Sequence, residues 1–146
     1  MDTFSETGSI LCDLEGDSLK NIIIRVLLFG FLVWLIPFVI AFGFYSPDGK
    51  LQTDIFLFKT VMILVGNATG CYFLFLISKR VTLPALKPFL IIGVIWLLEN
   101  LGLDMLILVP MSKMNLHDYF IQIGLRYFVI LFVSTAVGAA IDASKR

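Results

Sequence analysis

The chain has 146 residues, of which 59% are hydrophobic and 15% are charged, and its mean hydropathy is +0.97. A soluble domain has roughly 45–50% apolar and about 25% charged residues, so this composition excludes an ordinary soluble protein and indicates an integral membrane protein. The formal net charge of zero, from 11 basic and 11 acidic residues, leaves no basic surplus for phosphates and argues against a nucleic-acid partner.

Residues 1–19 form an acidic N-terminal segment without Lys or Arg. For this cytoplasmic tail we expect either disorder or a short interfacial helix, since three of its apolar residues share one helical face. The apolar stretch after Arg25 is too long for the core of a secretory signal, so the first span is predicted to stay uncleaved. Residues 20–146 are predicted to form one membrane domain.

Four stretches have the length and apolar character of membrane-spanning helices, which need about 20 residues each. The first contains Pro37, which removes one backbone hydrogen bond and is expected to act as a hinge or kink. A packing role is the simpler interpretation of this proline, and a ligand site at a broken helix is the alternative. Pro110 disfavours helix at the residue before it, so the third span is predicted to end at Val109. The predicted spans are residues 20–45, 54–79, 84–109 and 116–142.

Small residues in the second and fourth spans are suited to close contacts between helices. Gly66 and Gly70 form a GxxxG pattern on the same face as Lys59, and Gly138 lies in a small-residue stretch near the C-terminus. GxxxG is a weak signal because glycine is frequent in membrane helices. Packing within the bundle and dimerisation therefore both stay open.

The distribution of basic residues predicts the orientation of the chain. In a four-span threading with antiparallel neighbours, one side has only Lys50 and Lys113 near the span ends. The other side carries seven basic residues: Lys20, Arg25, Lys79, Arg80, Lys87, Lys145 and Arg146. Because Lys and Arg stay on the cytoplasmic side, we predict an all-α, four-transmembrane-helix bundle of the cell membrane with both termini in the cytoplasm.

Polar side chains gather in the outer half and the middle of the last three spans. Such groups are costly in a bilayer, so each needs a partner or an aqueous surface. Counting about 1.5 Å per residue from the outer span ends puts Lys59 level with Asp104, and a similar count puts Arg126 level with Glu99. We therefore expect two ion pairs, with amide side chains as further partners. The candidate residues are Lys59, Glu99, Asn100, Asp104, Gln122 and Arg126.

This cluster leaves two functional classes open. The first is a transporter or channel subunit that uses the cluster for an ion, a proton or a small polar solute. The alternative is a non-catalytic accessory or scaffold protein in which the charged pairs are structural. A water-accessible cavity at Asn100 and Asp104 would favour the transporter, and a dry, fully paired cluster would favour the scaffold.

An enzyme has the least support among the classes considered. The sequence has no nucleophile–His pairing and no metal-ligand or cofactor motif, and its single histidine, His117, lies in an outer loop. We therefore assign no catalytic residue, metal or cofactor. The expected partners are the lipid bilayer and either a second copy of the chain or another membrane protein.

The orientation can be tested by cysteine accessibility. We expect cysteines introduced at Gly49 and Ser112, in a background without Cys12 and Cys71, to react with a membrane-impermeant thiol reagent added from outside the cell. Labelling of both positions only from the cytoplasmic side would contradict the predicted threading.

Overall fold

The structure, a computed structural model, describes residues 3–81 and 84–144. Within these ranges the chain is helical and forms no strand, apart from a single bridge between Tyr45 and Leu51. Four helical segments are long and apolar enough to cross a membrane. The prediction of an all-helical chain with four such segments is therefore confirmed. These segments are Lys20–Phe42, Ile55–Ser78, Leu86–Ser112 and Gly124–Ser144.

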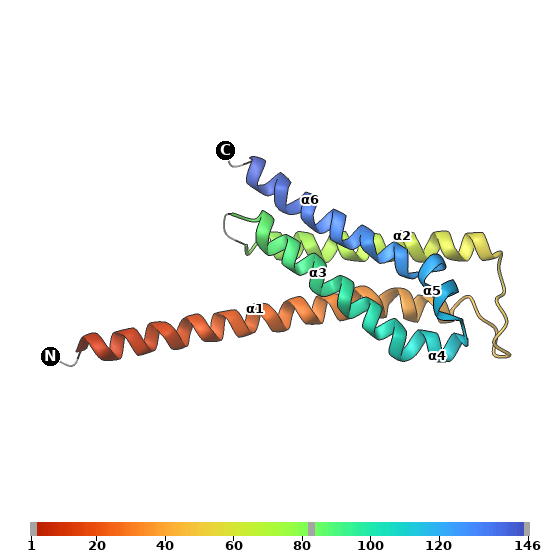
Figure 1. The fold of residues 1–146 in the computed structure, drawn as a ribbon, viewed down its shortest axis with the longest axis horizontal. Helices are drawn as coiled ribbons and strands as arrows, with labels where there is room; N and C mark the ends of the chain where they lie inside the picture. The colour runs from red at the N-terminus through yellow and green to blue at the C-terminus, as the bar shows by residue number, and fades with distance from the viewer. Residues whose placement is uncertain (1–2, 82–83, 145–146) are drawn as a thin grey trace.

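The first helix, α1 (Thr3–Phe42), is the longest element. It extends well beyond the other helices at its N-terminal end (Figure 1). The backbone of the acidic segment belongs to this helix, without a break before the first span. The helix also continues through Pro37, which therefore does not end it. It stops at Phe42, three residues before the predicted end of the first span at residue 45.

A loop over residues 43–54 joins α1 to α2 (Ile55–Ser78). Its tip is a turn in which Gly49 adopts a φ of 73° and donates its N–H to the Ser46 carbonyl at 2.9 Å. Glycine suits this left-handed conformation because it has no Cβ. Asp54 then caps α2 by accepting the N–H groups of Phe56 and Leu57 at 2.9 and 3.1 Å.

The third span has three parts: α3 (Leu86–Leu103), a π-helical turn η1 (Asp104–Leu108) and α4 (Val109–Ser112). In the π turn the N–H of Val109 donates to the carbonyl of Asp104, five residues earlier. A regular α-helix would bring the Pro110 ring against the preceding turn, whereas the wider π turn accommodates it. The prediction that the third span ends at Val109 is therefore wrong, because the helix continues to Ser112.

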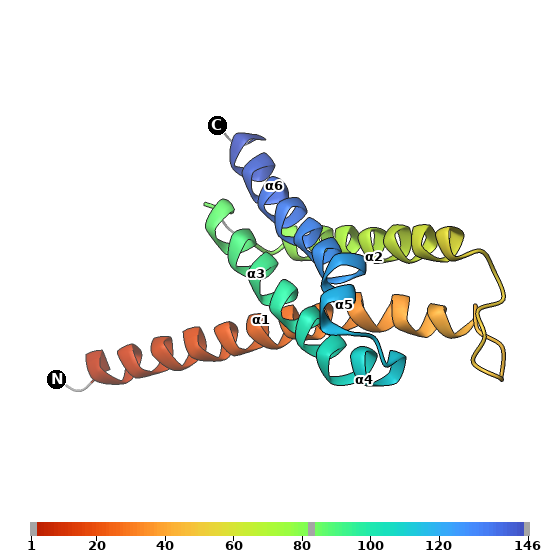
Figure 2. The same ribbon diagram turned by 45° about the vertical axis from the view of Figure 1, so that its right-hand side comes forward.

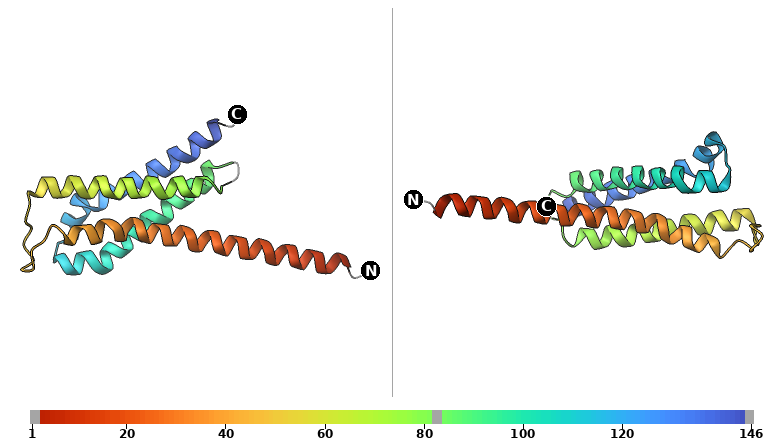
Figure 3. Two further views of the ribbon diagram at one scale, coloured as in Figure 1. Left: turned by 180° about the vertical axis from the view of Figure 1, so that it is seen from behind. Right: turned by 90° about the horizontal axis from the view of Figure 1, so that it is seen from below.

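The predicted fourth span, residues 116–142, is not one helix. It is divided into α5 (Leu116–Gln122), a 3₁₀ turn η2 (Gly124–Tyr127) and α6 (Phe128–Ser144), with a break at Ile123. A Cβ on Gly124 would lie 2.9 Å from the Phe120 ring, so the ring of α5 packs directly over this glycine. The part long enough to cross a membrane starts at Gly124, and α5 lies at the end of the bundle as a separate element (Figure 3).

The most extensive helix contact is that of α3 with α6, which run side by side in Figures 1 and 2. Two glycines allow this approach. A Cβ on Gly93 would lie 3.0 Å from Ser134 Cβ, and one on Gly138 would lie 2.8 Å from Phe89 Cβ. The Ser134 hydroxyl also donates to the Phe89 carbonyl. The other tight contacts are those of α1, which packs against both α2 and α3.

At the end where α3 begins, Asp142 of α6 joins the two helices. Its carboxylate oxygens accept the N–H groups of Ala85 and Leu86 at 2.7 and 3.0 Å. These N–H groups are at the start of α3, where no carbonyl of the same helix is available. Asp142 thus acts as an N-cap supplied by another helix. The buried apolar core lies between this cap and the polar cluster, and it includes Val33, Leu74, Ile77, Phe89 and Ile92.

Replacing Gly138 by alanine should destabilise the α3–α6 pair, because the new methyl group would meet backbone and Cβ atoms that cannot rotate away. We expect a loss of about 1–3 kcal/mol, measured as a lower thermal unfolding midpoint in detergent. The matched control is Gly102→Ala in α3, where no atom lies within 4 Å of the position of the added Cβ. The control should be neutral or stabilising, by roughly 0.5–1 kcal/mol. Equal midpoints for the two variants would contradict the packing.

Candidate functional site

The polar cluster is centred on Asp104, the first residue of the π turn, whose side chain is 1% exposed. Its Oδ1 accepts the indole N–H of Trp34 at 2.7 Å. Its Oδ2 accepts the phenol groups of Tyr119 and Tyr127 at 2.8 and 2.7 Å. We call these four side chains the Asp104 cage. The three donors come from α1, α5 and η2, so the cage joins three separate parts of the fold.

All three donors in the cage are uncharged. A buried carboxyl group is costly unless its oxygens are hydrogen-bonded, and here both oxygens have partners. The phenol of Tyr119, which precedes the fourth span, is protonated at neutral pH, and burial and the adjacent Asp104 both raise its pKa further. The cage therefore satisfies the carboxyl group without a basic side chain.

Lys59 does not pair with Asp104, contrary to the sequence prediction. Its ammonium group donates to Gln122 Oε1 at 3.2 Å, in a half-buried position. The prediction failed because it counted depth alone and ignored the Trp and Tyr donors that occupy both Asp104 oxygens. Gln122, at the end of α5, thus links the N-terminal part of α2 to the segment that precedes the fourth span.

Arg126 does not pair with Glu99 either, and no ion pair between these residues occurs in the described part of the chain. The reason is the face of α3 on which Glu99 lies. Its carboxyl group is beside Gly30 of α1, whereas α6, which follows Arg126, packs against α3 at Gly93 and Gly138.

Glu99 and Asn100 lie where α3 packs against α1. A Cβ on Gly30 would overlap the Glu99 carboxyl group, so the missing side chain of Gly30 makes room for it. Asn100 is fully buried, and its Nδ2 donates to the carbonyls of Trp96 at 2.8 Å and Gly30 at 3.4 Å. Trp96 donates its own indole N–H to the Val26 carbonyl at 2.8 Å.

Two buried oxygens of this region lack a hydrogen-bond partner among the described residues: Glu99 Oε2 and Asn100 Oδ1. Buried acceptors without donors are uncommon in folded proteins. These two atoms are therefore the part of the cluster that a proton, a water molecule or a cation could still satisfy.

The aromatic members of the cluster were not among the sequence candidates. Trp34, Tyr127 and Trp96 each donate a hydrogen bond inside the bundle. A signal for them exists in the sequence, because a buried Trp or Tyr needs a partner for its polar atom. Their spacing does not reveal which acceptor each of them meets.

The predicted packing residues occupy different environments. Gly66 faces Pro37, whose Cγ would be 3.8 Å from an added Cβ, so this glycine lies beside the proline of α1. Gly70 is buried, but no atom lies within 4 Å of the position of its missing Cβ. Gly138 lies against the first turn of α3, as described above.

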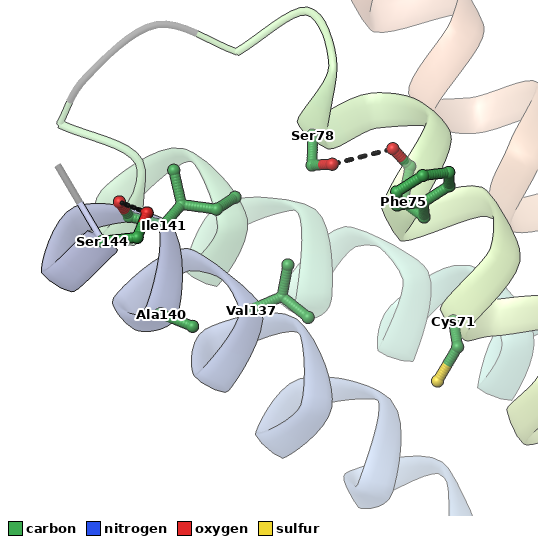
Figure 4. Close-up of a pocket in the computed structure, with 7 residues that line it drawn as sticks. All are labelled: Cys71, Phe75, Ser78, Val137, Ala140, Ile141 and Ser144. Carbon is green, nitrogen blue, oxygen red and sulfur yellow. Dashed lines mark hydrogen bonds between the residues drawn. The ribbon is translucent and has the colours of Figure 1, made fainter.

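Two cavities lie away from the Asp104 cage, and no member of the cage lines either of them. One, of about 10 Å³, lies between α2, α3 and α6 beside Gly66, Asn67 and Trp96. That volume is about enough for one water molecule. The other is an open groove of about 330 Å³ between α2 and α6 (Figure 4). The described residues include no group of three or more side chains suited to hold a metal ion.

Comparison with known protein families, with curated proteins and with solved structures finds no match to this chain. The geometry of the polar cluster and of the helix surfaces is therefore the basis for a functional proposal.

Replacing Asp104 by asparagine should destabilise the fold, because an amide nitrogen would face a donor in place of one acceptor oxygen. We expect a loss of about 1–3 kcal/mol, measured by thermal unfolding in detergent. The matched control is Glu99→Gln in the same span, since the buried Oε2 of Glu99 accepts no hydrogen bond from the described residues. The control should unfold at or above the wild-type midpoint. A midpoint for Asp104→Asn as high as that of Glu99→Gln would contradict the cage.

Proposed function

We propose that this protein is a non-catalytic accessory or scaffold protein of the cell membrane, in which the polar cluster braces the bundle. The observation that carries this proposal is the Asp104 cage: the carboxyl group is buried and both of its oxygens are hydrogen-bonded. A group that moves a solute must exchange partners with water or with the solute. An internal brace, in contrast, is best kept dry and fully bonded.

The position of the brace supports the same interpretation. The cage connects α1 to the third span and to the segment that leads into the fourth span. The hydrogen bond from Lys59 to Gln122 adds α2 to this network. Each of the four spans is thus held near the end that the positive-inside rule assigns to the outer side, with consecutive spans antiparallel and both termini in the cytoplasm.

The outward surface of the bundle supports a role in contacts with lipid and with another membrane protein. Only 17–33% of the apolar stretch of each span is buried inside the molecule. Large apolar side chains are exposed on every span, among them Ile24, Phe56, Leu64, Leu98, Leu106 and Phe132. A protein of this kind acts through its helix surfaces, because packing between apolar helices is what drives association within a bilayer.

A transporter or channel subunit is the second candidate, and one observation favours it. The unpartnered oxygens of Glu99 and Asn100 are adjacent in the sequence and lie deep in the third span. Buried ionisable groups in membrane helices commonly mark paths for ions or protons. On this alternative Glu99, rather than Asp104, would be the group that takes up and releases the proton or cation.

Flux measurements separate the two candidates. The purified protein, reconstituted into liposomes with a pH-sensitive or potassium-sensitive dye inside, should give proton and potassium fluxes equal to those of empty liposomes. A flux above that background that is lost in Glu99→Gln would overturn the scaffold proposal.

Photocrosslinking in cells supplies the positive test. A photoreactive amino acid is placed at exposed apolar positions of each span, such as Leu64 in α2 and Leu98 in α3. Positions on one face of the bundle should all crosslink to the same partner protein, recognised by a crosslinked product of the same mass, and positions on the other faces should not. Crosslinks to lipid alone from every face would contradict the proposal.

A further inference from the structure

A groove lies between α2 and α6. In Figures 1 and 2 the two helices diverge toward the C-terminal end of α6. The space between them has a volume of about 330 Å³. In Figure 4 side chains from both helices line it: Cys71, Phe75, Ser78, Val137, Ala140, Ile141 and Ser144.

The lining of the groove changes from apolar to polar along its length. Its inner part is formed by side chains such as Cys71 and Val137, whereas hydroxyl groups of Ser78 and Ser144 lie at the wide end. From Cys71 to Ser78 the helix rises by about 10 Å, which is a third of a hydrocarbon core of roughly 30 Å. A phospholipid has the same arrangement along its length, because its apolar acyl chains are joined to a polar headgroup.

Positive charge lies at the wide end of the groove. Lys79 and Arg80 directly follow α2, and both side chains are exposed. The Lys79 ammonium group lies 4.5 Å from the centre of the Phe75 ring, and Phe75 is one of the residues that line the groove. The nearby acidic residue of α6, Asp142, is turned toward α3, where it caps Ala85 and Leu86.

We propose that this groove binds one anionic phospholipid, with an acyl chain between α2 and α6 and the headgroup against Lys79 and Arg80. The argument is charge complementarity. A neutral lipid or an apolar partner helix could fill the apolar part, but only an anionic headgroup also uses Lys79, whose ammonium group lies over Phe75, and the adjacent exposed Arg80. Basic pockets between membrane helices bind anionic headgroups in this way. The proposal requires that the helices span a membrane and does not depend on the scaffold function.

Native mass spectrometry of the full chain in mild detergent tests this proposal. The probes are dioleoyl-phosphatidylglycerol, which is anionic, and dioleoyl-phosphatidylcholine, which is not. We expect one phosphatidylglycerol per chain to bind at least tenfold more tightly than phosphatidylcholine. Equal affinity for the two lipids would overturn the proposal.

The headgroup contact is tested by the double variant Lys79→Gln with Arg80→Gln. It should lower the affinity for phosphatidylglycerol by at least about tenfold, since each basic side chain at an anionic surface contributes on the order of fivefold. The matched control, Lys50→Gln with Lys113→Gln, removes the same charge from the opposite end and should bind like the wild type. Equal losses in the two double variants would show nonspecific charge attraction and overturn the proposal.

The acyl-chain contact is tested by filling the groove. Ala140→Phe should abolish the bound lipid, whereas Ala139→Phe, at an exposed neighbouring position outside the groove, should keep it. Should Ala140→Phe fail to fold, the surface double variants decide the question alone. Dissociation of a dimer by Ala140→Phe, without any bound lipid in the wild type, would show that a second copy fills the groove and would overturn the proposal.

Discussion

One end of the bundle depends on one buried carboxyl group. Asp104 is 1% exposed and lies inside an apolar span, where an unsatisfied polar group would be costly. The hydrogen-bond partners of this carboxyl group are three neutral donors, Trp34, Tyr119 and Tyr127, rather than a basic side chain. Since each donor comes from a different element, satisfying this carboxyl group also determines how those elements are positioned relative to each other.

Two irregular segments of the described chain adjoin this carboxyl group. The π turn begins at Asp104 and carries the third span past Pro110. The break at Ile123 separates α5 from α6, and it allows Tyr119 before the break and Tyr127 after it to reach the same oxygen. Two phenols on a single straight helix, eight positions apart, would lie about 12 Å from each other along the axis. The break therefore allows both tyrosines to donate a hydrogen bond to the same carboxyl oxygen.

The opposite end of the molecule is held by different means. There α3 and α6 approach through Gly93 and Gly138, and Asp142 of α6 caps the first turn of α3. These contacts draw α6 toward α3 and leave the groove between α6 and α2. The closely packed pair and the open groove are thus two consequences of the same small-residue interface. The groove is the site to which we assign the bound lipid.

The sequence by itself determined the class of this protein and its main segments. Length and hydrophobicity are properties of a local stretch of chain, so four helices that could cross a membrane were predictable from the sequence. For the first two of them, the predicted bounds are also close to those observed. The presence of polar residues within the third span was equally plain from the sequence, as was the need for each of them to find a partner.

Only the tertiary structure decided which partners those are. The predicted pairs of Lys59 with Asp104 and of Arg126 with Glu99 were chosen by counting residues for depth, which does not show the neighbour that each side chain faces. Aromatic donors occupy both oxygens of Asp104, and Glu99 lies beside Gly30 of α1. The π turn and the break also change the helical register beyond them, and neither has a reliable local signature. The cage around Asp104 joins residues that are 15 to 70 positions apart in the chain, so their contact is a property of how the helices pack and not of any one segment.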